Sequence, residues 1–314
     1  MSYRNHLRQA SDLKTPPADT RAGFVEMAVE RSARAVPYVS EAKALHAAAS
    51  NTESPEQLLG LSAIRSGLIS AAGISDKASG HMLDEDKTQA INDLIANHLE
   101  TAGSSYIEEL VYRFLLTKGD TLGGSIRNVT GTLAGRKLIR GILSALNLAG
   151  VPYSWRASAK SGWISSTPED AGIEAQLRSL AWSNCKGPRV LLFNCNAPMV
   201  GKNIDYCLLS CDPATYEESI GNPNSYIALG ELKGGNDPAG ADEHWKTASK
   251  ALMRIRAGFS SSEKLPSTFF IGADIVTDMA NEIWKELEEG TLTNAANLTN
   301  PNQLASVCSW LIGL

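Results

Sequence analysis

The apolar pattern of this chain of 314 residues changes near residue 150, and this change limits the folds open to it. Before that point, apolar residues recur at helical spacing, as in AGFVEMAVERSARAVPYVSEAKALHAAA and SSYIEELVYRFLL, and strand-like runs are nearly absent. After Pro152, short apolar or alternating runs are separated by turn residues. We therefore predict a helical domain over residues 1–150 and an α/β (α+β) domain over residues 151–314, with a mixed sheet flanked by helices.

Local signals place the main elements of both halves. In the second half we expect strands at 189–195, 203–211, 225–233 and 267–274, and helices at 243–257 and 277–289. In the first half we expect Pro37 to interrupt the first long helix and GDTLGG (119–124) to end a later one. A further helix is expected to end at Gly150.

Composition excludes some classes of protein. No apolar run reaches the roughly 18 to 20 residues that a membrane span needs, so neither a transmembrane protein nor a membrane partner is expected. The polar start MSYRNHLRQASDLK does not resemble a secretory signal, and the five sparse cysteines predict a reduced, cytoplasmic location. The net charge of −5 excludes a uniformly basic nucleic-acid coat. Residues 113–140 nevertheless carry six basic side chains against one acidic, whereas residues 274–289 carry six acidic against one basic.

The segment from Asn203 to Lys250 has the residues best suited to chemistry. Glu231 and Lys233 are two apart on an expected strand and therefore share a face, and a neighbouring strand can bring Asp205 alongside them. Two carboxylates offer hard oxygen ligands for Mg²⁺, and an ammonium group can orient a water or a phosphate. This set indicates phosphodiester hydrolysis.

The same spacing also arises by chance, as two solvated charges on an edge strand. Here Glu231 and Lys233 end an otherwise apolar strand, where charge is costly unless it is paired or metal-bound. Gly234 and Gly235 follow, and they would let the backbone approach a ligand closely.

Longer stretches resemble the AvaI/BsoBI family of type II restriction endonucleases. The resemblance is carried by LGELKGGNDPAGADEHWKTA (229–248), NIDYCLLSC (203–211), RAGF (21–24), GISDKA (73–78), GDTLGG with RN (119–128), FIGA (270–273) and TLTNAANLTN (291–300). It therefore covers nearly the whole chain.

This resemblance implies a Mg²⁺-dependent nuclease of the PD-(D/E)xK fold, acting as a homodimer that encircles double-stranded DNA. Asp205, Glu231 and Lys233 fall on the catalytic acidic pair and lysine of the family, with both carboxylates as metal ligands. His244 falls on an active-site histidine, where a neutral imidazole can take a proton from water, although a histidine at a helix start is often only structural. Asn203 and Ile204 precede Asp205, so the proline of the superfamily name is missing; it supplies no ligand.

The family resemblance also implies a target, C-Y-C-G-R-G, cut after the first base to leave four-base 5′ overhangs, and a cognate methyltransferase in the same restriction-modification system. Lys202, Asp237 and Lys77 are candidate base readers, because lysine can donate to guanine and aspartate can accept from cytosine. Arg127 and Arg136 are candidate phosphate contacts. The alternative is that these charges are merely solvated.

Two other functions stay open on the sequence: a structure-specific or repair nuclease with the same core, and a non-catalytic DNA-binding protein. The intact set of Asp205, Glu231 and Lys233 argues against the second.

Overall fold

The computed structural model describes residues 1–158, 160–167, 170–235, 237–263 and 265–314, apart from the side chains of Arg127 and Asn128. Its α-helices are α1 (Pro17–Ala49), α2 (Arg65–Ala71), α3 (Asp76–Ser79), α4 (Asp84–Leu94), α5 (Tyr106–Leu148), α6 (Tyr216–Ile220), α7 (Ala241–Gly258), α8 (Thr277–Glu288) and α9 (Pro301–Gly313). Its strands are β1 (Tyr153–Arg156), β2 (Ile164–Ser165), β3 (Ser179–Asn184), β4 (Gly187–Ala197), β5 (Lys202–Leu209), β6 (Tyr226–Lys233), β7 (Ser267–Gly272) and β8 (Asn294–Asn297).

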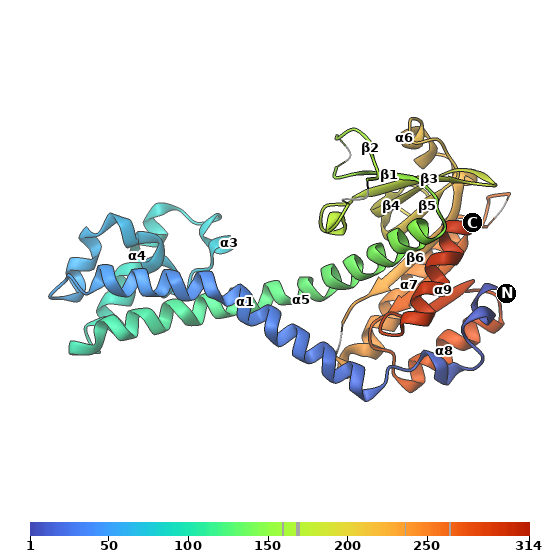
Figure 1. The fold of residues 1–314 in the computed structure, drawn as a ribbon. Helices are drawn as coiled ribbons and strands as arrows, with labels where there is room; N and C mark the ends of the chain where they lie inside the picture. The colour runs from blue at the N-terminus through green and yellow to red at the C-terminus, as the bar shows by residue number, and fades with distance from the viewer. Residues whose placement is uncertain (159, 168–169, 236, 264) are drawn as a thin grey trace. The chain divides into compact units, whose positions relative to one another are not determined.

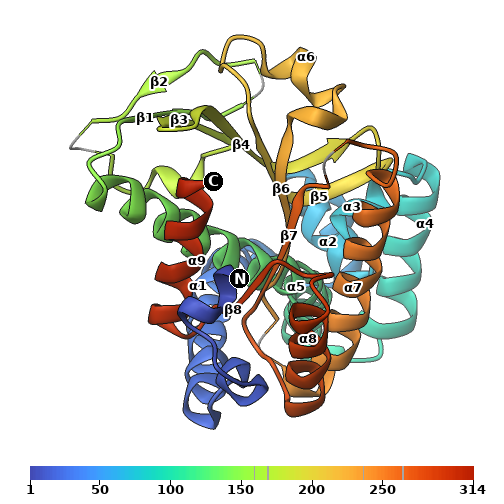
Figure 2. The same cartoon turned by 90° about the vertical axis from the view of Figure 1, so that its right-hand side faces the viewer.

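In the described residues, eight strands form one mixed sheet with the order β2-β1-β3-β4-β5-β6-β7-β8. Figure 1 labels β1 to β6 of this sheet, and Figure 2 labels all of these strands. The pairs from β2 to β6 are antiparallel, whereas β6–β7 and β7–β8 are parallel. The mixed α/β architecture is confirmed, and the four expected strands appear as β4, β5, β6 and β7. The sequence analysis missed β1, β2, β3 and β8; β8 reads NAAN and has no apolar alternation to reveal it.

Helices cover both faces of this sheet (Figure 2). One face packs under α7 and α8 and buries Cys207, Leu229 and Phe270. The other packs under α9 and the C-terminal part of α5 and buries Tyr206, Ala228 and Phe269. Because side chains alternate along a strand, Asp205 faces α7 as Cys207 does, and Glu231 faces α7 as Leu229 does. Asp205 and Glu231 therefore belong to the α7 side of the sheet.

The chain forms two compact units, Met1–Phe24 with Thr130–Leu314, and Val25–Val129. The boundary between them differs from residue 150, because Ala134, Leu138, Ile142 and Leu146 of α5 are buried against the sheet. The second unit is helical and has its own core, which includes Leu58, Leu99, Leu110 and Phe114. The functional division of the chain at residue 150 stays a prediction.

Two expected helix breaks are wrong. Helix α1 continues through Pro37, and α5 continues through Gly119–Gly124 to Leu148. A glycine inside a helix costs only about 1 kcal/mol. In α5 this cost is offset because Leu122, Ile126 and Val129 are buried along the same helix. In α1, the alanine-rich segments on both sides of Pro37 sustain the helix beyond the missing backbone donor. After Ser54 the chain forms 3₁₀ turns at Pro55–Gly60 and Ser62–Ile64, followed by α2. None of the described helices is long and apolar enough to cross a membrane.

Candidate active site

The predicted catalytic triad of side chains comes together at the end of strand β6. The antiparallel pairing of Tyr206 with Gly230 sets β5 and β6 in register, which brings Asp205 beside Glu231. The backbone N–H of Leu232 donates to Oδ2 of Asp205 at 2.8 Å, and Nζ of Lys233 donates to Oε2 of Glu231 at 3.1 Å. The predicted proximity of these three residues is therefore confirmed, while their roles stay predictions.

Glu231 is held in an environment that opposes its negative charge. Only 5% of the residue is exposed. Burial and the nearby Asp205 carboxylate raise the pKa of Glu231 to about 7, although the charges of Lys233 and Arg254 act in the opposite direction. Near neutral pH a cation placed beside Glu231 would therefore favour its ionised form.

The donor set at this place suits Mg²⁺ in the presence of DNA. Asp205 and Glu231 supply two hard carboxylate oxygens, and no cluster of three or more histidine, cysteine, aspartate or glutamate ligands occurs in the described residues. Mg²⁺ commonly takes one or two carboxylates and completes its coordination with water and substrate phosphate oxygens. Two carboxylates are therefore enough for this ion, whereas a structural zinc site needs more protein ligands.

His244 lies in the first turn of α7 and is half-buried. Its ring packs on the turn that follows β6, because a Cβ added at Gly235 would fall 2.4 Å from Nε2 of His244. At Gly234 an added Cβ would fall 2.4 Å from Cβ of Ala134 and 2.7 Å from the Thr130 carbonyl oxygen. The two glycines thus make room for the imidazole and for α5, and the close approach of a ligand to them stays a prediction.

The sequence analysis missed Asp274, which follows β7 and is only 6% exposed. Its Oδ2 is buried without a hydrogen-bond partner in the described part of the chain. Burial and the Asp237 carboxylate raise the pKa of Asp274, while His244 acts to lower it. The available signal is a carboxylate directly after the apolar run STFFIGA (267–273), which in the sequence also belongs to the acidic stretch 274–289.

The predicted base readers lie on the surface. Lys202 begins β5 and is exposed, as is Asp237, whose Oδ1 accepts a hydrogen bond from the Ala239 N–H at 3.0 Å and so caps the 3₁₀ turn Pro238–Gly240. Lys77 is exposed on α3, in the Val25–Val129 unit. Contact of these three residues with bases stays a prediction.

The basic stretch 113–140 is less available for phosphate than its sequence suggests. Arg113 is paired with Glu109 at 2.6 Å, Lys118 with Asp76 at 3.0 Å, and Arg140 with Glu174. Arg136 is half-buried, and its Nε has no partner among the described residues. Arg127 lies in α5, but its side chain is outside the described residues.

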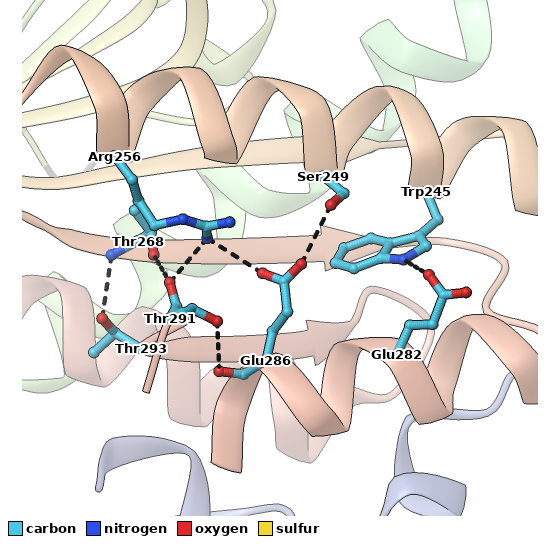
Figure 3. Close-up of polar contacts among 8 residues, drawn as sticks. All are labelled: Trp245, Ser249, Arg256, Thr268, Glu282, Glu286, Thr291 and Thr293. Carbon is cyan, nitrogen blue, oxygen red and sulfur yellow. Dashed lines mark hydrogen bonds and ion pairs between the residues drawn. The ribbon is translucent and has the colours of Figure 1, made fainter. Parts of the chain in front are cut away.

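A second polar group fixes the opposite flank of α7 against α8 (Figure 3). Nε1 of the buried Trp245 donates to Glu282 at 2.6 Å. Glu286 accepts hydrogen bonds from Ser249 and Arg256, each at 3.2 Å. Because Trp245 directly follows His244, this network anchors the start of the helix that carries the imidazole.

The chain is similar to known proteins along its whole length. It matches the family described as "Restriction endonuclease BsobI" over residues 3–314. It is 52% identical over 315 residues to the type II restriction enzyme AvaI of Nostoc sp., covering 100% of both chains. It is 46% identical over 317 residues to the type II restriction enzyme BsoBI of Geobacillus stearothermophilus, covering 99% of this chain and 98% of that one. A site of paired carboxylates and a lysine, within a match of this extent, shows that this chain belongs to the AvaI/BsoBI family of type II restriction endonucleases.

Proposed function

We propose that this protein is a Mg²⁺-dependent endonuclease that cuts double-stranded DNA at a specific sequence, with a site of the PD-(D/E)xK type. The observation that carries the proposal is the convergence of Asp205, Glu231 and Lys233 on the α7 face of the sheet. Membership of the family supplies the expected substrate.

Asp205 and Glu231 would hold the metal ion. When bound, Mg²⁺ neutralises charge on the phosphorus centre and acidifies a water. Lys233 has a separate task, since its ammonium group already contacts Glu231 and can stabilise negative charge on a phosphate oxygen. His244, at the start of α7, would accept the proton of the attacking water.

For the substrate we propose the family target C-Y-C-G-R-G, cut after the first base to leave four-base 5′ overhangs. The degenerate base pairs at its second and fifth positions need fewer major-groove contacts than fully specified ones. We further propose a homodimer around the DNA, with residues 1–150 contributing to the dimer and the DNA embrace, and a cognate methyltransferase that protects host DNA.

Digestion of a long duplex, followed by sequencing of the fragment ends, tests the proposal directly. We expect discrete fragments with Mg²⁺, none with a chelator, and binding without efficient cutting with Ca²⁺, which holds its ligands in a looser geometry. A smear, or cutting confined to branched DNA, would instead indicate the structure-specific nuclease. No cutting under any metal would leave only a DNA-binding protein.

The role of His244 has its own test. His244→Ala should lower the single-turnover cleavage rate by roughly 10²- to 10⁴-fold, the usual range for a general base. Thermal unfolding of the variant is the control. A loss of stability with an unchanged rate per folded molecule would make His244 a structural residue.

A further inference from the structure

The proposed chemistry does not explain why the Asp274 carboxylate lies where it does. It is buried, and its Oδ2 has no hydrogen-bond partner among the residues that the structure describes. An acceptor desolvated in this way costs free energy of folding unless another group interacts with it.

The backbone on both sides of Asp274 is fixed. The N–H of Ala273 donates to the Lys233 carbonyl oxygen at 2.8 Å, which ties this segment to the end of β6. Oγ1 of the buried Thr15 donates to the Ala273 carbonyl oxygen at 3.3 Å and accepts from the Ile275 N–H at 2.8 Å. The Asn297 side chain donates to the same Oγ1 at 2.7 Å. These hydrogen bonds fix the position of the backbone on both sides of Asp274.

Asp274 and His244 both lie close to the end of β6. Asp274 is attached there through the bond from Ala273 to Lys233, and the His244 ring packs on Gly235. The charged groups that act on Asp274 are Asp237, from the turn, and His244, from α7. On α8, Asp278 is exposed, and Glu282 is already bonded to Trp245. His244, once protonated, is thus the positively charged group that can pair with the Asp274 carboxylate.

We propose that Asp274 is the positioning residue of His244: a buried carboxylate near the imidazole that becomes its ion-pair partner once the imidazole is protonated. The inference rests on the general-base role proposed above. One O–H bond of the attacking water breaks and its proton forms an N–H bond on His244, while the oxygen keeps the electron pair and attacks phosphorus. The P–O3′ bond breaks, its electron pair leaves with the 3′ oxygen, and this oxygen takes a proton from solvent water. Asp274 neither gains nor loses a proton. Its negative charge, costly in the free enzyme, stabilises the imidazolium that forms.

The decisive variant is Asp274→Asn, compared with Asp278→Asn as a matched control on the nearby surface. The measurements are ¹⁵N NMR of the His244 imidazole, assigned through His244→Gln, together with thermal unfolding and single-turnover cleavage across pH. In Asp274→Asn we expect the ¹⁵N signals of the His244 ring to change at a given pH, because a negative charge near the imidazole is lost. We also expect cleavage to fall by at least roughly 10²-fold, with a melting temperature equal to or above that of the wild type. Asp278→Asn should change none of these.

An unchanged His244 resonance in Asp274→Asn overturns the inference, whatever the cleavage rate. So does a rate loss that is fully explained by unfolded protein. If Asp274→Asn does not fold, the reciprocal measurement decides: His244→Gln should raise the pH at which the ¹³C carboxyl signal of Asp274 titrates, and no change there overturns the pairing. Normal cutting by His244→Ala would refute the general base but leave the pairing visible by NMR, so the two failures are distinguishable.

Discussion

Polar and charged groups have different surroundings on the two flanks of α7. On the flank that faces α8, the indole of Trp245 and the side chains of Ser249 and Arg256 all have acidic partners on α8 (Figure 3). On the flank that faces the end of β6, Glu231 lies beside the Asp205 carboxylate. Oδ2 of Asp274 has no hydrogen-bond partner there among the described residues.

The difference separates residues that stabilise the fold from residues that are available for chemistry. Satisfied networks contribute stability, whereas unfavourable buried charges lower it and survive where function requires them. Substitutions on the first flank should therefore reduce stability and spare the rate. Substitutions on the flank that faces the end of β6 should lower the cleavage rate and spare stability.

The largest expected effect is on catalysis. Asp205→Ala, Glu231→Ala and Lys233→Ala should each lower the cleavage rate by at least about 10³-fold, because stabilisation of the transition state is lost. Binding to the target in Ca²⁺ should survive, and a gel-shift assay beside single-turnover kinetics measures both. Near-normal cutting by Asp205→Ala would refute the assignment.

On the other flank we expect the opposite outcome. Glu286→Ala removes the hydrogen bonds from Ser249 and Arg256 and should lower the free energy of unfolding by about 2 to 3 kcal/mol. The rate per folded molecule should stay at the wild-type value. Glu289→Ala, at an exposed position just after α8, is the matched control and should change stability little. A large rate loss in Glu286→Ala would break the contrast between the flanks.

Glu231 should make the stability of the metal-free protein depend on pH. Its pKa is raised from 4.5 to about 7 on folding, so the folded state binds more protons in this window than the unfolded state does. Stability should be greatest below about pH 4.5 as far as Glu231 contributes, and should fall, by on the order of 2 kcal/mol, as the pH rises through 7. Urea unfolding at a series of pH values measures this. Glu231→Gln should remove this part of the slope; an identical slope would contradict the assignment.

Smaller effects are expected in recognition. Lys202→Ala or Asp237→Ala should narrow the affinity gap between the target and one-base variants by about 1 to 2 kcal/mol, if each residue contacts a base. Asp237 also caps a turn, so Asp237→Asn is the useful control: asparagine keeps the cap but loses the charge that accepts from cytosine. Equal weakening on every sequence would show that neither residue reads bases.

The smallest effect is expected from the phosphate contacts. Arg136→Ala or Arg127→Ala should weaken binding to all sequences alike, with the slope of log affinity against log salt reduced by about one. Binding titrations at several salt concentrations measure this. Arg140→Ala is the comparison, because Arg140 is already paired with Glu174. An equal effect of all three substitutions would show that ion pairing does not withdraw Arg140 from DNA.

Local patterns were sufficient for much of the fold and for the core of the site. Alternation and length identified β4, β5, β6 and β7, and the period of two placed Glu231 and Lys233 on one face. Local rules failed where long-range packing offset a local cost, as at Pro37 and Gly119–Gly124, or where a strand had no apolar pattern, as in β8.

The sequence by itself determined the family, the strands that bear the carboxylates and the types of side chain available for hydrolysis. Only the tertiary structure decided which charges remain without partners. It paired half of the basic stretch with acids and placed Asp274 near an imidazole 30 positions earlier in the chain, against a turn whose glycine admits the ring. Periodicity describes neighbours along one element, whereas burial and electrostatic pairing depend on residues that only folding brings together.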